Sequence, residues 1–398
     1  MFAAIRIFIH NYFKCIKNEE EFNDLVNLAE LDESFKEAAR MVRGKILLKK
    51  KELWYHTKDY PFIKFKLIPK SIDFEVCNYK NVIYELRLCD MSFTNEDLKN
   101  LQKIDLAYVK VSFRLSRIDL SLLKNVNALE LFHSSYNNIP YIESLTRIDL
   151  SHSSIKTTLN MEHLKSVDLS YTSIADVSAL KSVANINISF TPVTDVSMLG
   201  KVKCLNISHT KVKNVSALED ILYLIASYTL ITDVSMLGKL KCLDISCTNV
   251  LDVSALGNVK DLRMARTKVT DISKLGNNYK IDISDTKITD ISPLKYVQVL
   301  ILYKAIVTDI SMLVNIRILN MTHTNITDIS KLKTIEILYM SHTPITDISA
   351  LTNIISLEMV NTRVKDISTL KKLKYLTLSM ENMIDTSSLQ KLRRVTRH

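Results

Sequence analysis

Two residue types that can act as an acid and a nucleophile, Asp and Ser, recur together along most of this chain. A Ser occurs every 19 residues from Ser178 to Ser387, and an Asp stands two residues before it except at Asn214. Nucleophilic catalysis needs a single Ser or Cys activated by a base, most often His. Here the Ser occurs twelve times, eleven of them with the Asp, and no His keeps a fixed distance from it. The pattern therefore predicts a structural role for Asp and Ser and no enzymatic activity.

A second column of residues has side chains suited to binding. It lies one residue before a recurrent Thr and contains five of the nine His residues of the chain. Its members are His133, His152, Tyr171, Phe190, His209, Tyr228, Cys247, Arg266, Asp285, Lys304, His323, His342, Asn361 and Met380. Aromatic side chains bury a large area for little rotamer entropy, so the column predicts a protein-binding ridge. Alternatively, these are tolerated edge residues that only cover their neighbours.

We expect the partner-binding residues in this column and on the outward face of the strands beside it. They are His209, Tyr228, Arg263, Arg266, Asp285, Lys304, His323, Tyr339 and His342. The same face is otherwise polar, but Ile225 and Ile301 interrupt it, with Leu230 and Ile306 nearby. Exposed apolar spots of this kind favour contact with another protein.

Adjacent His residues in the column could share a metal ion, as with His133 and His152 or His323 and His342. Two ligands without a neighbouring Cys or carboxylate make an incomplete zinc site. There is also no phosphate-binding loop, paired-Cys motif or glycine fingerprint. We therefore expect neither a metal nor a cofactor.

The six Cys residues do not predict a disulfide framework. Cys204 and Cys242 share a column but stand two repeats apart, which is roughly 9.6 Å at the spacing of strands in a sheet. That separation is too large for a disulfide bond. Free thiols in a reducing compartment are the simpler interpretation.

Short strands must position these columns. An alternating apolar pair such as Leu205 and Ile207 precedes each member of the column and indicates a strand of about four residues. A strand this short can satisfy its backbone only by pairing with the same strand of the next repeat, about 4.8 Å away. The strict 19-residue period therefore predicts a solenoid with one long parallel sheet.

Other recurring residues indicate how each repeat turns. The Thr column runs from Thr172 to Thr362, fails only at Ala305, and supplies a hydroxyl that can bond backbone groups of the turn. The Asp-x-Ser-x-Leu segment predicts a capped turn or one turn of 3₁₀ helix, with Leu in the core. Four of the five Gly residues follow this Leu, where we expect a positive φ: Gly200, Gly238, Gly257 and Gly276.

The motif Leu-x-Leu, followed by a fixed polar residue and Ile-x-Asp-Ile-Ser-x-Leu, resembles the leucine-rich repeats of internalins and the similar arrays of large DNA viruses and bacteria. The resemblance covers about residues 127–390. It implies an α/β solenoid with a parallel β-sheet on the concave face and short 3₁₀ or turn segments on the convex face. Thr replaces the usual Asn, and the repeat is shorter than the common length of about 20 to 29 residues.

The composition changes before the array, and we expect three parts: a helical cap or F-box-like module in residues 1–60, irregular leading repeats in 61–126 and the solenoid in 127–398. Asn18 and Glu21 have the spacing of a capping box, and apolar residues then follow a helical period. A helical cap would shield the open end of the solenoid core.

The same N-terminal segment resembles an F-box, a helical module that docks on a Skp-type adaptor of a ubiquitin ligase. The resemblance depends on Leu25, Leu28, Phe35 and Trp54. The segment lacks the opening Leu-Pro of the family and its usual Cys and Trp near Phe35. The resemblance implies a substrate receptor for such a ligase.

Charge and hydropathy limit the choice of partners. The net charge of +10 permits nucleic-acid binding, but no basic run is interleaved with aromatic residues in the array. Residues 1–13 are apolar, but they are interrupted by Arg6 and His10 and are too few to span a bilayer. We expect an intracellular protein without membrane contact, in the cytoplasm or, for a viral protein, in the host cytoplasm.

The function most consistent with these features is a non-enzymatic protein-interaction scaffold that holds a protein on its concave face. Coupling of that protein to a ubiquitin ligase is the more specific form of this hypothesis. A surface or virion attachment protein of internalin type is the alternative, and nucleic-acid binding is less favoured because it depends on charge alone.

Overall fold

The structure is a computed structural model that describes residues 44–48, 63–67, 82–87, 109–112, 119–123, 126–156, 162–380 and 384–397. The chain divides into two compact units, Met1–Thr172 and Ser173–His398. The strands described in the first unit are β1 (Gly44–Leu48), β2 (Ile63–Leu67), β3 (Val82–Arg87), β4 (Val109–Ser112), β5 (Ala128–Glu130), β6 (Arg147–Asp149) and β7 (Ser166–Asp168).

The second unit continues the pattern with three-residue strands, the last two being one residue longer. They are β8 (Asn185–Asn187), β9 (Cys204–Asn206), β10 (Tyr223–Ile225), β11 (Cys242–Asp244), β12 (Asp261–Arg263), β13 (Lys280–Asp282), β14 (Val299–Ile301), β15 (Ile318–Asn320), β16 (Ile337–Tyr339), β17 (Ser356–Glu358), β18 (Tyr375–Leu378) and β19 (Arg394–Arg397).

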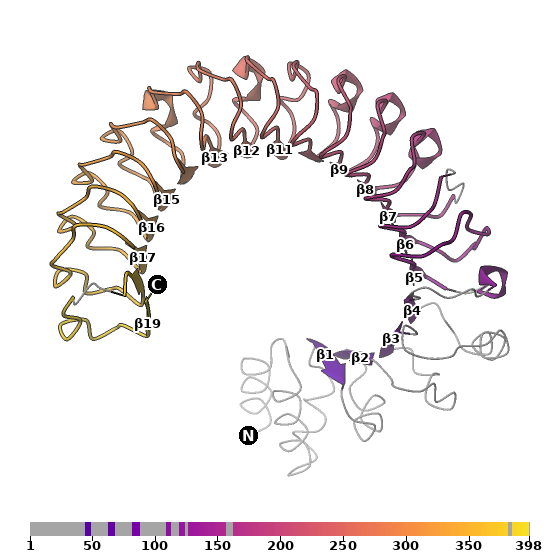
Figure 1. Cartoon of the computed structure of the whole chain (residues 1–398), viewed down its shortest axis with the longest axis horizontal. Helices are drawn as coiled ribbons and strands as arrows, with labels where there is room; N and C mark the ends of the chain where they lie inside the picture. Colours follow the sequence, from indigo (N-terminus) through magenta and orange to yellow (C-terminus); the bar gives the residue numbers. More distant parts are fainter. Residues whose placement is uncertain are drawn as a thin grey trace, which may run out of the picture. The chain divides into compact units, whose positions relative to one another are not determined.

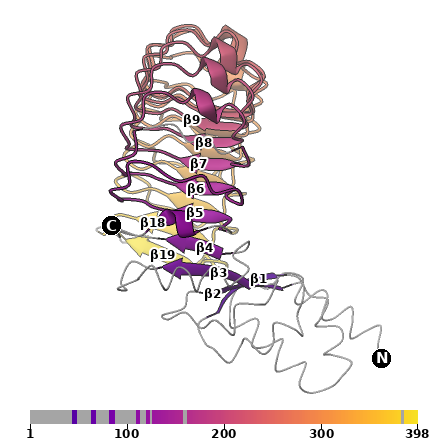
Figure 2. The same cartoon turned by 90° about the vertical axis from the view of Figure 1, so that its right-hand side faces the viewer.

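Within each unit every strand pairs in parallel with the next strand of the sequence. The register follows the repeat, so that Leu205, Leu224 and Leu243 lie side by side on β9, β10 and β11. Figure 1 shows the strands of the second unit along its inner side, and Figure 2 shows β5, β6 and β7 stacked in the first unit. The predicted parallel-sheet solenoid is confirmed.

The core of each repeat is built from residues at fixed positions. The middle residue of the strand and the residue after the strand are buried, as Leu224 and Ala226 are at 0% exposure. Apolar residues of the return segment, such as Val212 and Val215, and the recurrent Leu complete the interior. The invariant columns therefore have a packing role.

The hydroxyl of the recurrent Thr closes the turn at the end of most strands. The buried Thr210 hydroxyl donates to the carbonyl oxygen of Ile207 at 2.6 Å. The same bond recurs in ten repeats, made by Thr172, Thr191, Thr210, Thr229, Thr248, Thr267, Thr286, Thr324, Thr343 and Thr362. In the first unit Ser134 and Ser153 occupy this column, and their buried hydroxyls have no hydrogen-bond partner.

The Asp-x-Ser-x-Leu segment forms the predicted capped turn on the outer side. Asp195 Oδ1 accepts from the backbone N–H of Ser197 at 2.8 Å, which is an Asx-type turn, and Asn214 accepts from Ser216 at 2.9 Å. A 3₁₀ turn follows in several repeats: η4 (Ser178–Leu180), η5 (Ser197–Leu199), η6 (Ser216–Leu218), η7 (Ser254–Leu256) and η8 (Ser292–Leu294). In each of the twelve repeats with this segment a side-chain oxygen of Asp, or of Asn214, thus accepts a hydrogen bond from the backbone N–H of the Ser.

The expectation of positive φ at the glycines is wrong for most of them. Gly200 has a φ of −62° and Gly257 one of −58°, and among the described glycines only Gly276 is positive, at 141°. Space is the physical reason for Gly here, because a Cβ on Gly200 would stand 2.4 Å from the carbonyl oxygen of Ala217 in the next repeat. These glycines let successive outer turns pack closely.

The N-terminal predictions lie mostly outside the described residues. This holds for the helical cap predicted in residues 1–60, of which the structure describes only β1, and for the four F-box-like residues, Leu25, Leu28, Phe35 and Trp54. The boundaries at 60/61 and 126/127 stay predictions. In the part of the chain that the structure describes, no helix is long and apolar enough to cross a membrane.

The capping Asp residues predict loss of stability in acid. Their pKa values lie below the usual range because each carboxylate accepts hydrogen bonds from the backbone N–H and the hydroxyl of its Ser. A depressed folded-state pKa contributes stability above the unfolded value of about 4, and this contribution is lost as the pH falls through the folded pKa. We expect the urea midpoint, followed by circular dichroism, to decrease below about pH 4.

A control for this prediction exists in the chain, because Asn214 makes the same bond without a charge. The combined changes Asp233→Asn, Asp252→Asn and Asp271→Asn should lower the urea midpoint at pH 7 modestly, because a neutral amide accepts a weaker hydrogen bond than a carboxylate, and should make its acid dependence shallower. An unchanged acid dependence would show that other carboxylates are responsible.

Candidate functional site

The predicted ridge has an unusual backbone. Thirteen non-glycine residues of the described chain have a positive φ, and they are the predicted column from His133 to Asn361, with φ between 52° and 60°. The turn between Ile207 and Thr210 places His209 in this left-handed conformation, as in a type II turn, where Gly or Asn is usual. We call these thirteen residues the ridge.

The left-handed conformation explains part of the composition of the ridge. It costs most L-residues roughly 1–2 kcal/mol, whereas Asn, Asp and His are enriched there among non-glycine residues. The five His residues, Asp285 and Asn361 therefore fit a backbone requirement as well as a binding role. No such preference explains Tyr171, Phe190, Tyr228, Arg266 and Lys304.

In most repeats two hydrogen bonds hold the ridge residue in place. The N–H of His209 donates to the carbonyl oxygen of Ser227 in the next repeat at 3.0 Å, and Tyr228 donates to Ser246 in the same way. On the other side, the hydroxyl of the following Thr closes the turn. Consecutive ridge residues within a unit therefore share one backbone conformation and stand one repeat apart.

This ladder stacks aromatic rings along the ridge. In the second unit the Phe190 and His209 rings are 3.9 Å apart at 13°, and the His209 and Tyr228 rings are 4.2 Å apart at 14°. In the first unit His152 lies between His133 and Tyr171, at centroid distances of 4.6 and 4.2 Å. Neighbouring rings thus cover each other's faces and leave their edges toward solvent.

Beyond Tyr228 the ridge contains an ion pair and a second stack of His rings. Arg266 Nε donates to Asp285 Oδ2 at 3.1 Å, and this bond raises the pKa of the guanidinium. The His323 and His342 rings stack at 4.2 Å. Desolvation, followed by the effects of His342 and Lys304, lowers the pKa of His323, which favours a neutral ring at neutral pH. Seven of the nine predicted partner-binding residues lie on this ridge.

The other two predicted residues, Arg263 and Tyr339, lie on the outward face of the sheet. Arg263 on β12 forms an ion pair with Asp261 at 3.3 Å, and Lys280 contacts the same carboxylate at 3.2 Å. The Arg263 guanidinium is therefore already paired with a carboxylate of its own strand. Tyr339 on β16 is 38% exposed.

Large apolar side chains are exposed together in one repeat. On β10, Tyr223 and Ile225 face outward at 42% and 40% exposure, and Tyr228 and Leu230 follow at 49% and 45%. The sequence predicts a role for Ile225, Tyr228 and Leu230 but not for Tyr223. No other described repeat exposes as many large apolar side chains.

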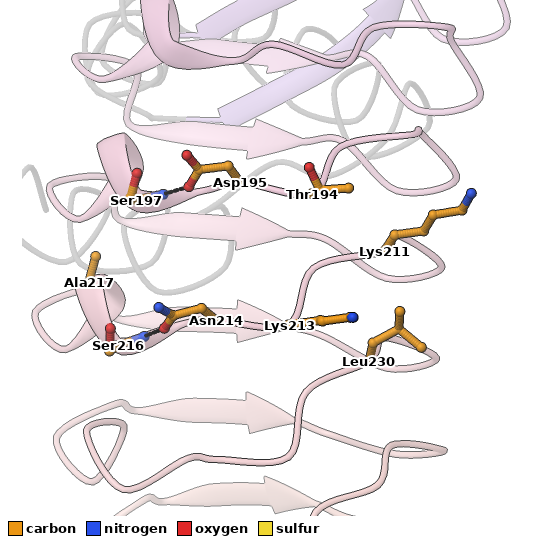
Figure 3. Close-up of a pocket in the computed structure, with 9 residues that line it drawn as sticks. All are labelled: Thr194, Asp195, Ser197, Lys211, Lys213, Asn214, Ser216, Ala217 and Leu230. Atoms are coloured by element: carbon orange, nitrogen blue, oxygen red, sulfur yellow. Dashed lines mark hydrogen bonds between the residues drawn. The ribbon is translucent and has the colours of Figure 1, made fainter.

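A groove lies on the outer flank beside this repeat (Figure 3). It has a volume of about 560 Å³ and is lined by Thr194, Asp195, Ser197, Lys211, Lys213, Asn214, Ser216, Ala217 and Leu230. Lys211 and Leu230 stand two residues after His209 and Tyr228, so the groove adjoins the ridge. The sequence did not predict this groove. The one replacement of Asp in the capping column, Asn214, does mark a repeat that lines it.

Neither a metal centre nor a disulfide emerges from the described side chains. They contain no group of three or more His, Cys, Asp or Glu residues placed to hold a metal ion. Cys204, Cys242 and Cys247 are free thiols, and burial raises the pKa of the Cys242 thiol. In each Asp-containing cap the carboxylate accepts a hydrogen bond from the backbone N–H of the Ser, which is a structural role for both residues.

Comparison with known proteins adds the fold class. No protein-family model matches the sequence, and no curated protein matches it. Among solved structures, an internalin (inlF) of Listeria monocytogenes gives a TM-score of 0.53 with 23% identity, covering 64% of this chain and 87% of that chain. The functional domain of InlJ from the same bacterium gives 0.55 with 18% identity, covering 74% of each chain.

A third similar structure is the leucine-rich-repeat ectodomain of the plant membrane receptor kinase GASSHO1/SCHENGEN3 from Arabidopsis thaliana, solved in complex with Casparian strip integrity factor 2. Its TM-score is 0.50 with 14% identity, covering 89% of this chain and 52% of that chain. These similarities and the parallel 19-residue turns define a leucine-rich-repeat fold. Its internalin-like character was predicted from the repeat motif and is confirmed at the level of the fold.

The left-handed ridge makes a specific prediction about stability. The variants Tyr228→Gly and Tyr228→Ala both lose the ring, but only Gly relieves the left-handed strain. We therefore expect the Gly variant to be more stable than the Ala variant by about 1 kcal/mol in urea unfolding. At Thr232, an exposed residue of the same repeat outside the ridge, the order should reverse. An Ala variant as stable as the Gly variant at position 228 would contradict the left-handed geometry.

Proposed function

We propose that this chain is a non-enzymatic protein-interaction scaffold whose partner contacts the concave sheet and the ridge of the second unit. The observation that carries the proposal is the ridge itself. The fold requires its left-handed turn, which Gly would adopt with least strain, yet large side chains occupy it in repeat after repeat. Strain retained in this way is typical of positions used for function.

The outward face of the sheet supports the same proposal. Its residues vary from repeat to repeat while the buried columns stay constant. Ile225 and Tyr339 are 40% and 38% exposed on this face, and such apolar side chains gain free energy when a partner covers them. The similar plant ectodomain is known as a complex with another molecule, which is consistent with a binding role for a leucine-rich-repeat array.

A ridge variant tests the proposal. We expect the combined changes Tyr228→Asn, Arg266→Asn and His323→Asn to weaken partner binding at least roughly tenfold, because central aromatic and Arg residues carry most interface energy. Asn tolerates the left-handed conformation, so the urea midpoint should stay close to that of the wild type. Partners captured by the wild-type chain would be identified by mass spectrometry, purified, and titrated against both proteins.

The control variant changes three exposed residues of the outer turns, Lys181→Ala, Lys295→Ala and Lys333→Ala, which lie away from the ridge. It should bind the partner with wild-type affinity. If the ridge variant also binds with unchanged affinity, the ridge is not the contact surface.

The more specific form of the proposal couples the captured protein to a ubiquitin ligase through residues 1–60. It is supported only by the F-box-like pattern of the sequence. If the full chain co-precipitates a purified Skp-type adaptor, the changes Leu25→Ala, Leu28→Ala and Phe35→Ala should abolish that interaction and leave the concave-face partner bound. Failure of the wild-type chain to bind the adaptor would end this hypothesis.

An attachment protein of internalin type is the competing proposal, and it has the same fold. The free thiols Cys204, Cys242 and Cys247 support our preference for a reducing, intracellular compartment. A partner that is a cell-surface protein would favour the attachment role instead.

A further inference from the structure

Three repeats of the second unit combine a stack of aromatic rings with a groove that contains cationic side chains. They contain the ring stack of Phe190, His209 and Tyr228 and, directly beyond it, the groove with Lys211 and Lys213. Leu230 borders the groove at 45% exposure. Consecutive α-carbons are about 3.8 Å apart, so residues two positions apart, such as His209 and Lys211, belong to one continuous surface.

The groove differs in charge from the equivalent capping segments of the other repeats. The capping column carries a carboxylate in eleven repeats, and its one neutral member, Asn214, lies in the groove. Lys213 stands in a column that otherwise holds mostly Thr. Asp195 also lines the groove and is negatively charged, so Lys211 and Lys213 leave an excess of one positive charge among the lining residues. The groove is therefore locally cationic.

The stacked rings add a second attraction for anions. Aromatic faces carry partial negative charge and aromatic edges partial positive charge. Both faces of His209 are covered by Phe190 and Tyr228, so the stack presents edges to an incoming ligand. Such edges favour carboxylate and carbonyl oxygens. They do not favour nucleic-acid bases, which bind single strands by stacking on open aromatic faces.

We propose that this surface binds an acidic, extended protein segment, with its carboxylates at Lys211 and Lys213 and an apolar side chain against Leu230 and the edge of the ring stack. The inference depends on the proposed scaffold function and specifies the chemistry of the partner. The net charge of +10 also favours an acidic partner over a second copy of this chain, because like charges repel.

The chain offers a matched control for the two lysines. Arg363 and Lys365 occupy the equivalent positions eight repeats later, but there the capping residue is Asp366, and the preceding ridge residue is Asn361. The same two cations thus occur without the neutral cap and without stacked rings. A purely general attraction by surface charge would act at both places.

The experiment titrates the full chain with fluorescein-labelled peptides followed by fluorescence anisotropy. One peptide is rich in Glu with interspersed Leu and Phe, and the second replaces every Glu by Gln. An oligothymidylate of equal charge tests the nucleic-acid alternative. We expect the Glu peptide to bind roughly tenfold or more tightly than the Gln peptide and the oligonucleotide, and to weaken with salt.

Two variants locate the site. The changes Lys211→Gln and Lys213→Gln should weaken binding of the Glu peptide roughly tenfold, and so should His209→Asn with Tyr228→Asn. The control changes Arg363→Gln and Lys365→Gln should alter the affinity less than about twofold. Urea midpoints of all three variants would show that the fold is retained.

The proposal is overturned if the Glu peptide binds no better than the Gln peptide, or if the control variant loses as much affinity as the groove variant. Tighter, groove-dependent binding of the oligonucleotide would also overturn it. None of these results would by itself remove the scaffold function. That function fails separately if the ridge variant of Tyr228, Arg266 and His323 keeps full affinity for the captured partner.

Discussion

The structure depends on one local constraint, the turn by which each strand leaves the sheet. The strand is only three residues long in most repeats, so its ladder must be extended beyond the strand itself. The N–H of the left-handed ridge residue donates one further hydrogen bond to the next repeat. The hydroxyl of the buried Thr that follows it closes the turn. Because the turn recurs with the 19-residue period, its side chains form a ladder of their own along the sheet edge.

The same turn links stability to recognition. A packing column is uninformative about a partner because its residues are selected for the core, but the ridge is both backbone-constrained and exposed. His, Asn and Asp satisfy the backbone at low cost, whereas Tyr, Phe, Arg and Lys do not. The ridge is therefore best interpreted by separating the two groups. The residues of the second group most need a functional explanation: Tyr171, Phe190, Tyr228, Arg266 and Lys304.

Much of this could be predicted from the sequence, since a strict period fixes which residues are neighbours. The sheet register, the Thr bond and the Asp cap follow from columns that can be aligned by eye. The glycines could not be explained in this way. Gly200 follows the recurrent Leu in sequence, but the carbonyl of Ala217 that excludes a side chain there belongs to the next repeat. The φ of Gly200 is negative, so the positive φ expected after the recurrent Leu does not explain this glycine.

The sequence by itself determined the repeat, the parallel sheet, the buried columns and the position of the ridge, because identical residues at a constant spacing have one consistent packing. Only the tertiary structure decided how the ridge side chains meet. The co-facial stack of Phe190, His209 and Tyr228 and the groove beside Lys211 and Lys213 arise between repeats. Contacts of this kind depend on the direction in which each side chain leaves the backbone, which the spacing of residues along a chain does not specify.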